Sequence, residues 1–170
     1  MKNIVLIGMM GSAKTSTGRA IAEKLNMPFF DGDEVYVAMF SESISETFEK
    51  HGEQEFRRRE VQVYQKLGAL DGAVIACGGG VVLNQENMTA LKSNGVIVQL
   101  TASPEAIYER VKRNDKRPLV REGGLEKIKQ IMSDRKSLYD EYADVTVDNT
   151  YLLPKKSADI VINLYRKFTK

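Results

Sequence analysis

Short apolar runs alternate along the chain with longer segments in which apolar residues recur every three or four positions. The first run, Asn3–Ile7, is almost continuous and is typical of a strand buried on both faces. Further short runs follow at Pro28–Phe30, Ala73–Ala76, Val96–Leu100 and Val145–Val147. This alternation predicts an α/β fold with a five-stranded parallel sheet and helices on both of its faces.

Helix start and stop signals lie between these runs. Ser43 with Glu46 three positions later predicts a capping box, for a short helix that ends near His51 and Gly52. A long charged helix is then expected over Glu53–Leu70, and later helices after Asn84 (closed by Gly95), after Ser103 to about Lys112, around Leu125–Leu138, and from Pro154 onward. The stretch 113–124 is rich in Lys and Arg and has no apolar period, which favours a flexible basic lid.

Composition bounds the class of protein. The 170 residues fit one domain, 1–170, with a hydrophobic core, and the net charge of +2 gives no support for a nucleic-acid or membrane partner. The single cysteine, Cys77, excludes an internal disulfide and favours a reducing compartment. The apolar run that follows Met1-Lys2 is too short to cross a membrane. These features favour a cytoplasmic protein, and we also expect it to be a monomer that acts on a small molecule.

A candidate phosphate loop lies between the first strand and the first helix. Its sequence is Gly8-Met9-Met10-Gly11-Ser12-Ala13-Lys14-Thr15, close to the pattern GxxxxGK[ST]. Backbone N–H groups and a helix N-terminus converge on an anion at such a turn. Lys14 would reach the β- and γ-phosphates of a nucleotide, and the Thr15 hydroxyl would bind Mg²⁺.

Ala13 departs from this pattern, because the last glycine of the loop is expected at its position. If the backbone torsion angle φ is negative there, alanine costs little. If φ is positive, some loss of stability or of nucleotide affinity follows. The alternative interpretation is a glycine-rich turn that binds no ligand. Only Ala13 supports this alternative, since Gly8, Gly11, Lys14 and Thr15 keep the spacing of the pattern.

Four further polar motifs fall at predicted strand ends or in the predicted lid, where a doubly wound sheet binds its ligands, and a fifth lies on the helix after the lid. In chain order they are Asp31-Gly32-Asp33, the run from Gly52 to Glu60 (GEQEFRRRE), Gly78-Gly79-Gly80, Lys116-Arg117-Pro118-Leu119, and Arg135-Lys136-Ser137-Leu138-Tyr139. In this order and at these separations the motifs resemble those of the shikimate kinases, over essentially the whole chain. The resemblance implies a three-layer P-loop kinase fold. It also implies transfer of the ATP γ-phosphate to the 3-hydroxyl of shikimate, giving shikimate 3-phosphate and ADP in aromatic amino acid biosynthesis.

The resemblance also implies which residues form the site. Shikimate would be held by Asp33, Arg57, Gly78, Gly79, Gly80 and Arg135. ATP would be held by Gly11, Ser12, Ala13, Lys14, Thr15, Ser16, Arg110, Arg117 and Pro154, with Mg²⁺ near Thr15 and Asp31. Lys14, Asp33 and Arg117 would be catalytic. These residue types suit the substrate, because two arginines can clamp a carboxylate and an aspartate can accept from, or deprotonate, a hydroxyl.

Other interpretations stay open at this point. Asp31 and Asp33 could be turn formers around Gly32, and most of the charge on Arg57–Arg59 could be a solvated helix face paired with Glu53, Glu55 and Glu60. Cys77 is interpreted as a small core residue and His51 as a helix C-terminal residue. Two alternative functions are a related kinase acting on gluconate or a nucleotide, and a nucleotide-binding module that has lost catalysis.

Overall fold

The computed structural model describes residues 1–113 and 123–170. Its strands are β1 (Asn3–Ile7), β2 (Phe29–Asp31), β3 (Val74–Ala76), β4 (Gly95–Thr101) and β5 (Val145–Asp148). Its helices are α1 (Lys14–Leu25), α2 (Gly32–Phe40), α3 (Ile44–Gly68), the 3₁₀ turn η1 (Val81–Leu83), α4 (Gln85–Ser93), α5 (Pro104–Val111), α7 (Gly124–Tyr142) and α8 (Pro154–Phe168). Nearly all of the predicted lid, 113–124, and with it Arg117, lies outside the described residues.

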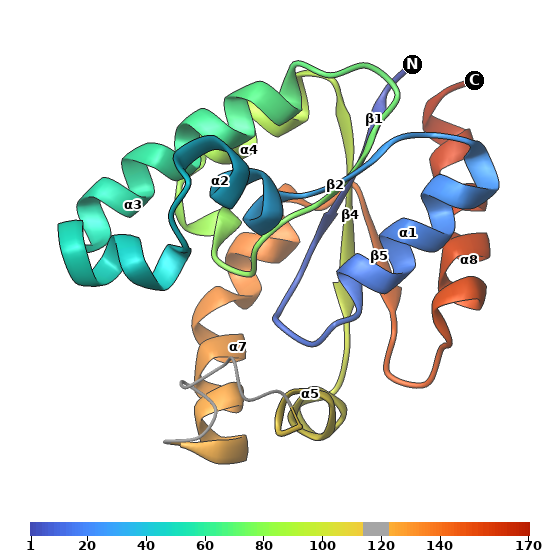
Figure 1. The fold of residues 1–170 in the computed structure, drawn as a ribbon. Helices are drawn as coiled ribbons and strands as arrows, with labels where there is room; N and C mark the ends of the chain where they lie inside the picture. Colours follow the sequence, from blue (N-terminus) through green and yellow to red (C-terminus); the bar gives the residue numbers. More distant parts are fainter. Residues whose placement is uncertain (114–122) are drawn as a thin grey trace.

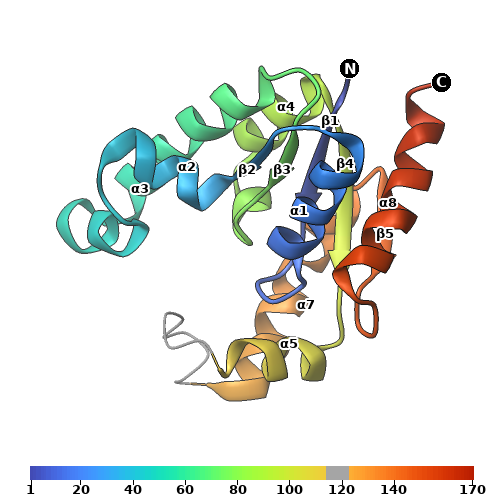
Figure 2. The same ribbon diagram turned by 45° about the vertical axis from the view of Figure 1, so that its right-hand side comes forward.

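The sheet is parallel throughout and has the strand order β2-β3-β1-β4-β5. Since β1 is fully buried between β3 and β4, its side chains alternate between two apolar layers. Ile4 and Leu6 pack with α1 and α8, whereas Val5 and Ile7 pack with α3, α4 and α7. Figures 1 and 2 show these helix groups on opposite faces of the sheet. The predicted three-layer α/β fold with five parallel strands is confirmed.

The long segment 44–68 contains the break that Gly52 predicts. Ser43 caps its start with the expected capping box, in which the Ser43 side chain accepts from Glu46 N–H and the Glu46 carboxylate accepts from Ser43 N–H. At Gly52 the backbone leaves the helical region, with φ of 83° and ψ of 174°. A positive φ is readily adopted by glycine, which explains why the kink falls at this residue.

One boundary prediction is wrong, and one helix was not predicted. Gly95 does not close α4 but begins β4, and Asn94 is the residue at the helix end. Helix α2 was not predicted, because Asp31-Gly32-Asp33 was expected to end the second strand and no helix was predicted directly after it. In the structure the Asp31 side chain caps α2, with its Oδ1 accepting from the N–H groups of Asp33 (3.0 Å) and Glu34 (3.4 Å).

Helix length and polarity also bear on membrane insertion. Within residues 1–113 and 123–170, every helix is too short or too polar to cross a membrane.

Candidate active site

The phosphate loop, residues 8–15, joins the carboxyl end of β1 to α1. Gly8 and Gly11 adopt positive φ angles of 144° and 76°. A Cβ atom on Gly8 would also lie 2.3 Å from the backbone oxygen of Leu100 on β4, closer than any side chain tolerates. These two positions therefore require glycine. Turns that present backbone N–H groups to an anion commonly contain glycine for this reason.

Lys14 is the first residue of α1, and its side chain folds back over the loop. The buried Nζ donates to the backbone oxygens of Gly8 (2.7 Å) and Met9 (2.8 Å). The buried Ser12 hydroxyl donates to the same Met9 oxygen at 2.7 Å, while the exposed Ser16 hydroxyl lies 3.3 Å from Ala13 O. The ammonium group thus adds its charge to the positive end of the α1 dipole, which suits an anionic phosphate.

A pair of oxygen donors lies beside the loop. The Thr15 hydroxyl donates to Asp31 Oδ2 at 2.9 Å, so the first turn of α1 and the end of β2 meet there. A hydroxyl and a carboxylate are the hard oxygen ligands that Mg²⁺ prefers, and Mg²⁺ usually takes one or two protein ligands together with phosphate and water. The two residues therefore fit the Mg²⁺ ion that was predicted near them from the sequence.

Arg110 on α5 fixes the loop that precedes α8 to the phosphate loop. Its guanidinium donates to Gly11 O at 3.0 Å, and to Asn149 O and Thr150 O at 2.7 and 3.2 Å. The buried Asn149 amide donates in turn to Ser12 O at 3.0 Å. Pro154 follows as the first residue of α8. The predicted adenine-side residues Arg110 and Pro154 therefore lie on segments joined to the phosphate loop.

The three successive glycines after β3 (Gly78, Gly79 and Gly80, the glycine wall) bring together the predicted acceptor residues. A Cβ atom on Gly78 would lie 3.0 Å from Asp33 Oδ1. One on Gly79 would lie 3.6 Å from Arg135 Nη1, and one on Gly80 would lie 3.4 Å from Arg57 Nη1. Each glycine thus faces one of the three polar side chains, and any larger residue would occupy the space between them.

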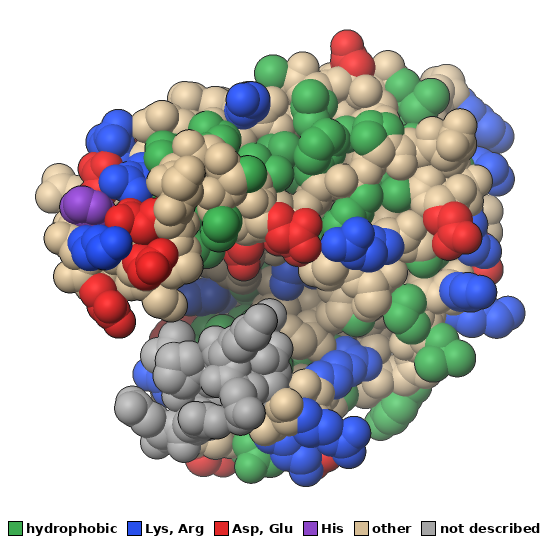
Figure 3. Space-filling view, viewed as in Figure 1, with side chains coloured by type: hydrophobic (Ala, Val, Ile, Leu, Met, Phe, Trp, Pro, Cys, Tyr) green, Lys and Arg blue, Asp and Glu red, His purple; other side chains and the backbone are tan. Residues whose placement is uncertain are grey.

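The glycine wall also adjoins the phosphate loop. The same Cβ position on Gly79 lies 3.4 Å from Met10 N and 3.7 Å from Gly8 O. β1 and β3 are neighbours in the sheet, so both loops leave the same edge. Figure 3 shows this face hollowed beneath α2 and α3, with acidic and basic side chains close together in the hollow. A phosphate donor and a polar acceptor can meet at this edge.

Arg57 is held by a buried carboxylate. Its Nη1 donates to Glu60 Oε1 at 3.1 Å, and Asn87 of α4 donates to the same oxygen at 3.0 Å. Burial raises the pKa of Glu60, and the positive charge of Arg57 opposes that rise. The interpretation of Glu60 as part of a solvated face is wrong, because its position on α3 turns toward α4. The exposed Arg58–Glu55 pair at 2.7 Å does fit that interpretation.

Several residues that shape the site carried no assigned role in the sequence. The Tyr64 hydroxyl accepts from Gly78 N–H at 2.9 Å, and the Tyr139 hydroxyl donates to Gly79 O at 2.5 Å. Tyr139 ends the motif that begins at Arg135, and that adjacency was the one available signal. Tyr64 and Asn149 stand in no motif, and only the packing of distant elements reveals their contacts. Cys77, buried beside the glycine wall, has a pKa raised by burial, which suits a core thiol.

A separate cavity of about 310 Å³ lies behind the phosphate loop, between β4, α5 and α7. Its mainly apolar lining includes Met9, Leu100, Ile107, Met132 and Tyr139. The predicted acceptor residues Asp33, Arg57 and Arg135 face the glycine wall and do not line this cavity.

Ala13 has a φ of 68° and a ψ of 31°, the left-handed conformation that L-residues avoid. The strain is about 1–2 kcal/mol for such a residue, and the lower backbone entropy of alanine in the unfolded chain offsets part of it. We expect Ala13→Gly to raise the free energy of unfolding by about 1 kcal/mol and the melting temperature by about 2–4 °C. Thermal and urea unfolding measure both quantities.

The matched control for Ala13→Gly is Ala38→Gly, the same chemical change at an exposed position inside α2. Helical backbone favours alanine there, so this variant should lose about 1 kcal/mol. A loss of stability in both variants would contradict the left-handed strain assigned to Ala13.

Comparison with known proteins identifies the family to which the chain belongs. The family model described as shikimate kinase matches residues 10–166. A shikimate kinase of Thermodesulfovibrio yellowstonii is 44% identical to this chain, and the match covers 99% of this chain and 98% of the relative. A shikimate kinase of Caldicellulosiruptor saccharolyticus is 42% identical, and the match covers 97% of this chain and 96% of the relative. A solved shikimate kinase from Acinetobacter baumannii, in complex with shikimate, superposes with a TM-score of 0.92 at 33% identity, covering 98% of this chain and 94% of that one. The phosphate loop, the glycine wall and these matches together show that the chain belongs to the shikimate kinase family.

Proposed function

We propose that this chain transfers the γ-phosphoryl group of Mg-ATP to the 3-hydroxyl of shikimate. The observation that carries the proposal is the glycine wall, which meets Asp33, Arg135 and Arg57 at its three residues and lies beside the phosphate loop. This combination of two guanidinium groups and one carboxylate suits a small acid with several hydroxyls. Family membership favours shikimate over gluconate or a nucleotide as the acceptor.

The acceptor residues have different roles, which follow from their chemistry. Arg57 and Arg135 bind the shikimate carboxylate through charge-assisted hydrogen bonds, and their rigid planar groups fix its orientation. Asp33 accepts from the attacking hydroxyl and is placed to take its proton as the new P–O bond forms. The glycine wall adds no side chain, so the ring can approach the backbone directly.

The donor residues neutralise charge. Lys14 and the N–H groups of the phosphate loop bind the β- and γ-phosphates and stabilise the charge that develops on the transferred group. Thr15 and Asp31 would hold Mg²⁺, which supplies further charge neutralisation on the phosphate oxygens. Arg110 and Pro154 border the nucleotide on the adenine side. Gly11, Ser12, Ala13 and Ser16 complete this donor side through the backbone of the loop and the first turn of α1.

The described donor and acceptor residues lie around one edge of the sheet. We propose that the partner of this site is a small molecule and that the chain acts as a monomer. The two apolar layers share one sheet, which supports a single domain. A buried free thiol at Cys77 is consistent with a cytoplasmic location.

The reaction product tests the proposal. Incubation with Mg-ATP and shikimate should yield shikimate that carries one phosphoryl group at its 3-hydroxyl, measured by ³¹P NMR and mass spectrometry. An unmodified acceptor, or a phosphoryl group on another hydroxyl, would refute the assignment.

Asp31→Asn tests the magnesium ligands without unfolding α2. Asparagine caps helices as well as aspartate does, so the melting temperature should change little. The loss of the carboxylate charge should raise the Mg²⁺ concentration for half-maximal rate by about tenfold or more. Thr15→Ser keeps the hydroxyl and should leave that concentration close to the wild-type value. An unchanged Mg²⁺ dependence in Asp31→Asn would remove Asp31 from the metal site.

A further inference from the structure

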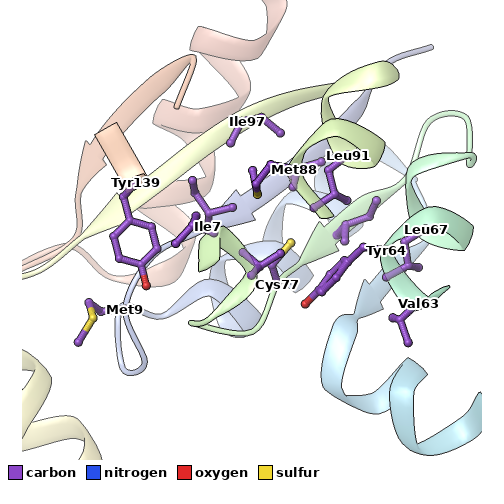
Figure 4. Packing of buried hydrophobic residues seen from close by; sticks show 14 of the residues in the cluster. Ile7, Met9, Val63, Tyr64, Leu67, Cys77, Met88, Leu91, Ile97 and Tyr139 are labelled. Atoms are coloured by element: carbon purple, nitrogen blue, oxygen red, sulfur yellow. The ribbon is translucent and has the colours of Figure 1, made fainter. Parts of the chain in front are cut away.

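The glycine wall is held in place by two buried tyrosines that lie far apart in the sequence, on α3 and α7. Tyr64 of α3 accepts from Gly78 N–H at 2.9 Å, and Tyr139 of α7 donates to Gly79 O at 2.5 Å. Figure 4 shows the two rings on either side of Cys77, the residue that precedes the wall. The two peptide groups at the centre of the acceptor site are therefore fixed by side-chain hydroxyls outside the sheet.

Both hydroxyls keep their protons. Tyr64 is 2% exposed and Tyr139 is 3% exposed. Burial raises the pKa of Tyr64 well above its ordinary value, and the nearby Cys77 thiol and the Asp33 and Glu60 carboxyl groups add to the rise. Burial also raises the pKa of Tyr139, against a smaller opposing effect of Arg135. Tyr139 consequently remains a hydrogen-bond donor to Gly79 over the working pH range.

Each tyrosine also touches the element that carries one of the polar acceptor groups. The Tyr64 hydroxyl lies 2.6 Å from the Cβ position of Gly32, so it sits between Gly78 and the residue before Asp33. Tyr139 lies one helical turn after Arg135 on α7, on the same side of that helix. Tyr64 thus contacts both Gly78 and the residue before Asp33, and Tyr139 contacts Gly79 from the helix that carries Arg135.

We infer that Tyr64 and Tyr139 are positioning residues for the acceptor, a role that rests on the function proposed above. Neither needs to touch shikimate. Each fixes a peptide group of the glycine wall relative to one side chain that binds the acceptor. Their hydroxyls determine the affinity for shikimate, and the nucleotide site does not depend on them.

The test is removal of each hydroxyl in Tyr64→Phe and Tyr139→Phe, which keep the ring and its packing. A lost hydrogen bond at this position should raise the KM for shikimate about tenfold, with kcat and the KM for ATP within about twofold of wild type. Calorimetric titration with shikimate should show the same loss of affinity. The Gly78 amide should exchange its hydrogen faster in Tyr64→Phe than in the wild-type protein.

Tyr165→Phe is the matched control. Tyr165 of α8 is also buried, and its hydroxyl donates to a backbone oxygen, that of Lys2, at 2.6 Å on the other face of the sheet. This variant should lose comparable thermal stability and keep the wild-type KM for shikimate. If Tyr64→Phe and Tyr139→Phe also lose only stability, the inference is overturned. Should one variant fail to fold, the KM for shikimate of the other variant tests the inference. Wild-type protein without shikimate-dependent turnover would instead refute the proposed function.

Discussion

Lys14→Ala should lower kcat by about 10³-fold, the largest effect expected of any single change in this chain. The Lys14 ammonium is held over the phosphate loop by hydrogen bonds to Gly8 O at 2.7 Å and Met9 O at 2.8 Å. Phosphoryl transfer depends on charge neutralisation more than on covalent chemistry, so this loss falls on the transition state. Steady-state ADP release with saturating shikimate measures it.

Lys24→Ala is the control for this change. Lys24 lies at the other end of α1 and pairs at the surface with Asp159, at 2.5 Å. Its removal should leave kcat within about twofold, since surface ion pairs contribute little. A near-normal kcat in Lys14→Ala, with the fold intact by circular dichroism, would be incompatible with a nucleotide bound at this loop.

Arg135→Ala should raise the KM for shikimate by about 10²-fold and leave the KM for ATP within about twofold. A charge-assisted hydrogen bond contributes about 1.5–3 kcal/mol, and the guanidinium can make two to one carboxylate. Arg135→Lys should recover only part of the affinity, because an ammonium group cannot form the paired contact. Initial rates over a matrix of shikimate and ATP concentrations separate the two constants.

The neighbouring residue on α7 supplies the control for Arg135. Lys136 pairs with Asp140 on the helix surface. Lys136→Ala removes the same charge one position away and should leave both KM values near wild type. Equal damage to the shikimate and ATP constants in Arg135→Ala would show that Arg135 does not belong to the acceptor site.

Local sequence signals predicted much of this protein. The buried run Asn3–Ile7 gave the central strand, the Ser43–Glu46 pair gave the start of α3, and the strand–loop–helix context of Lys14 located the phosphate loop. Each of these features depends on residues close together in the chain. The motif order then suggested the family, which assigned roles to Asp33, Arg57 and Arg135.

The remainder depends on contacts between distant segments. Tyr64 meets Gly78 and Tyr139 meets Gly79 only after α3 and α7 have packed on the sheet. Glu60 is spaced like an ion-pairing surface residue, and its burial became visible only through its contact with Asn87 of α4. The left-handed backbone of Ala13 became visible only in the folded structure, because the sequence left the sign of φ undecided.

ADP release by the purified chain with Mg-ATP, with and without shikimate, tests the central claim most directly. Gluconate and AMP serve as alternative acceptors. We predict turnover that depends on shikimate and stays at background with the other two, which would also show that Ala13 is tolerated in the phosphate loop. Turnover with gluconate or AMP instead would contradict the acceptor assignment. The absence of ADP release with every acceptor, in both the wild-type chain and Ala13→Gly, would indicate a nucleotide-binding module without kinase activity.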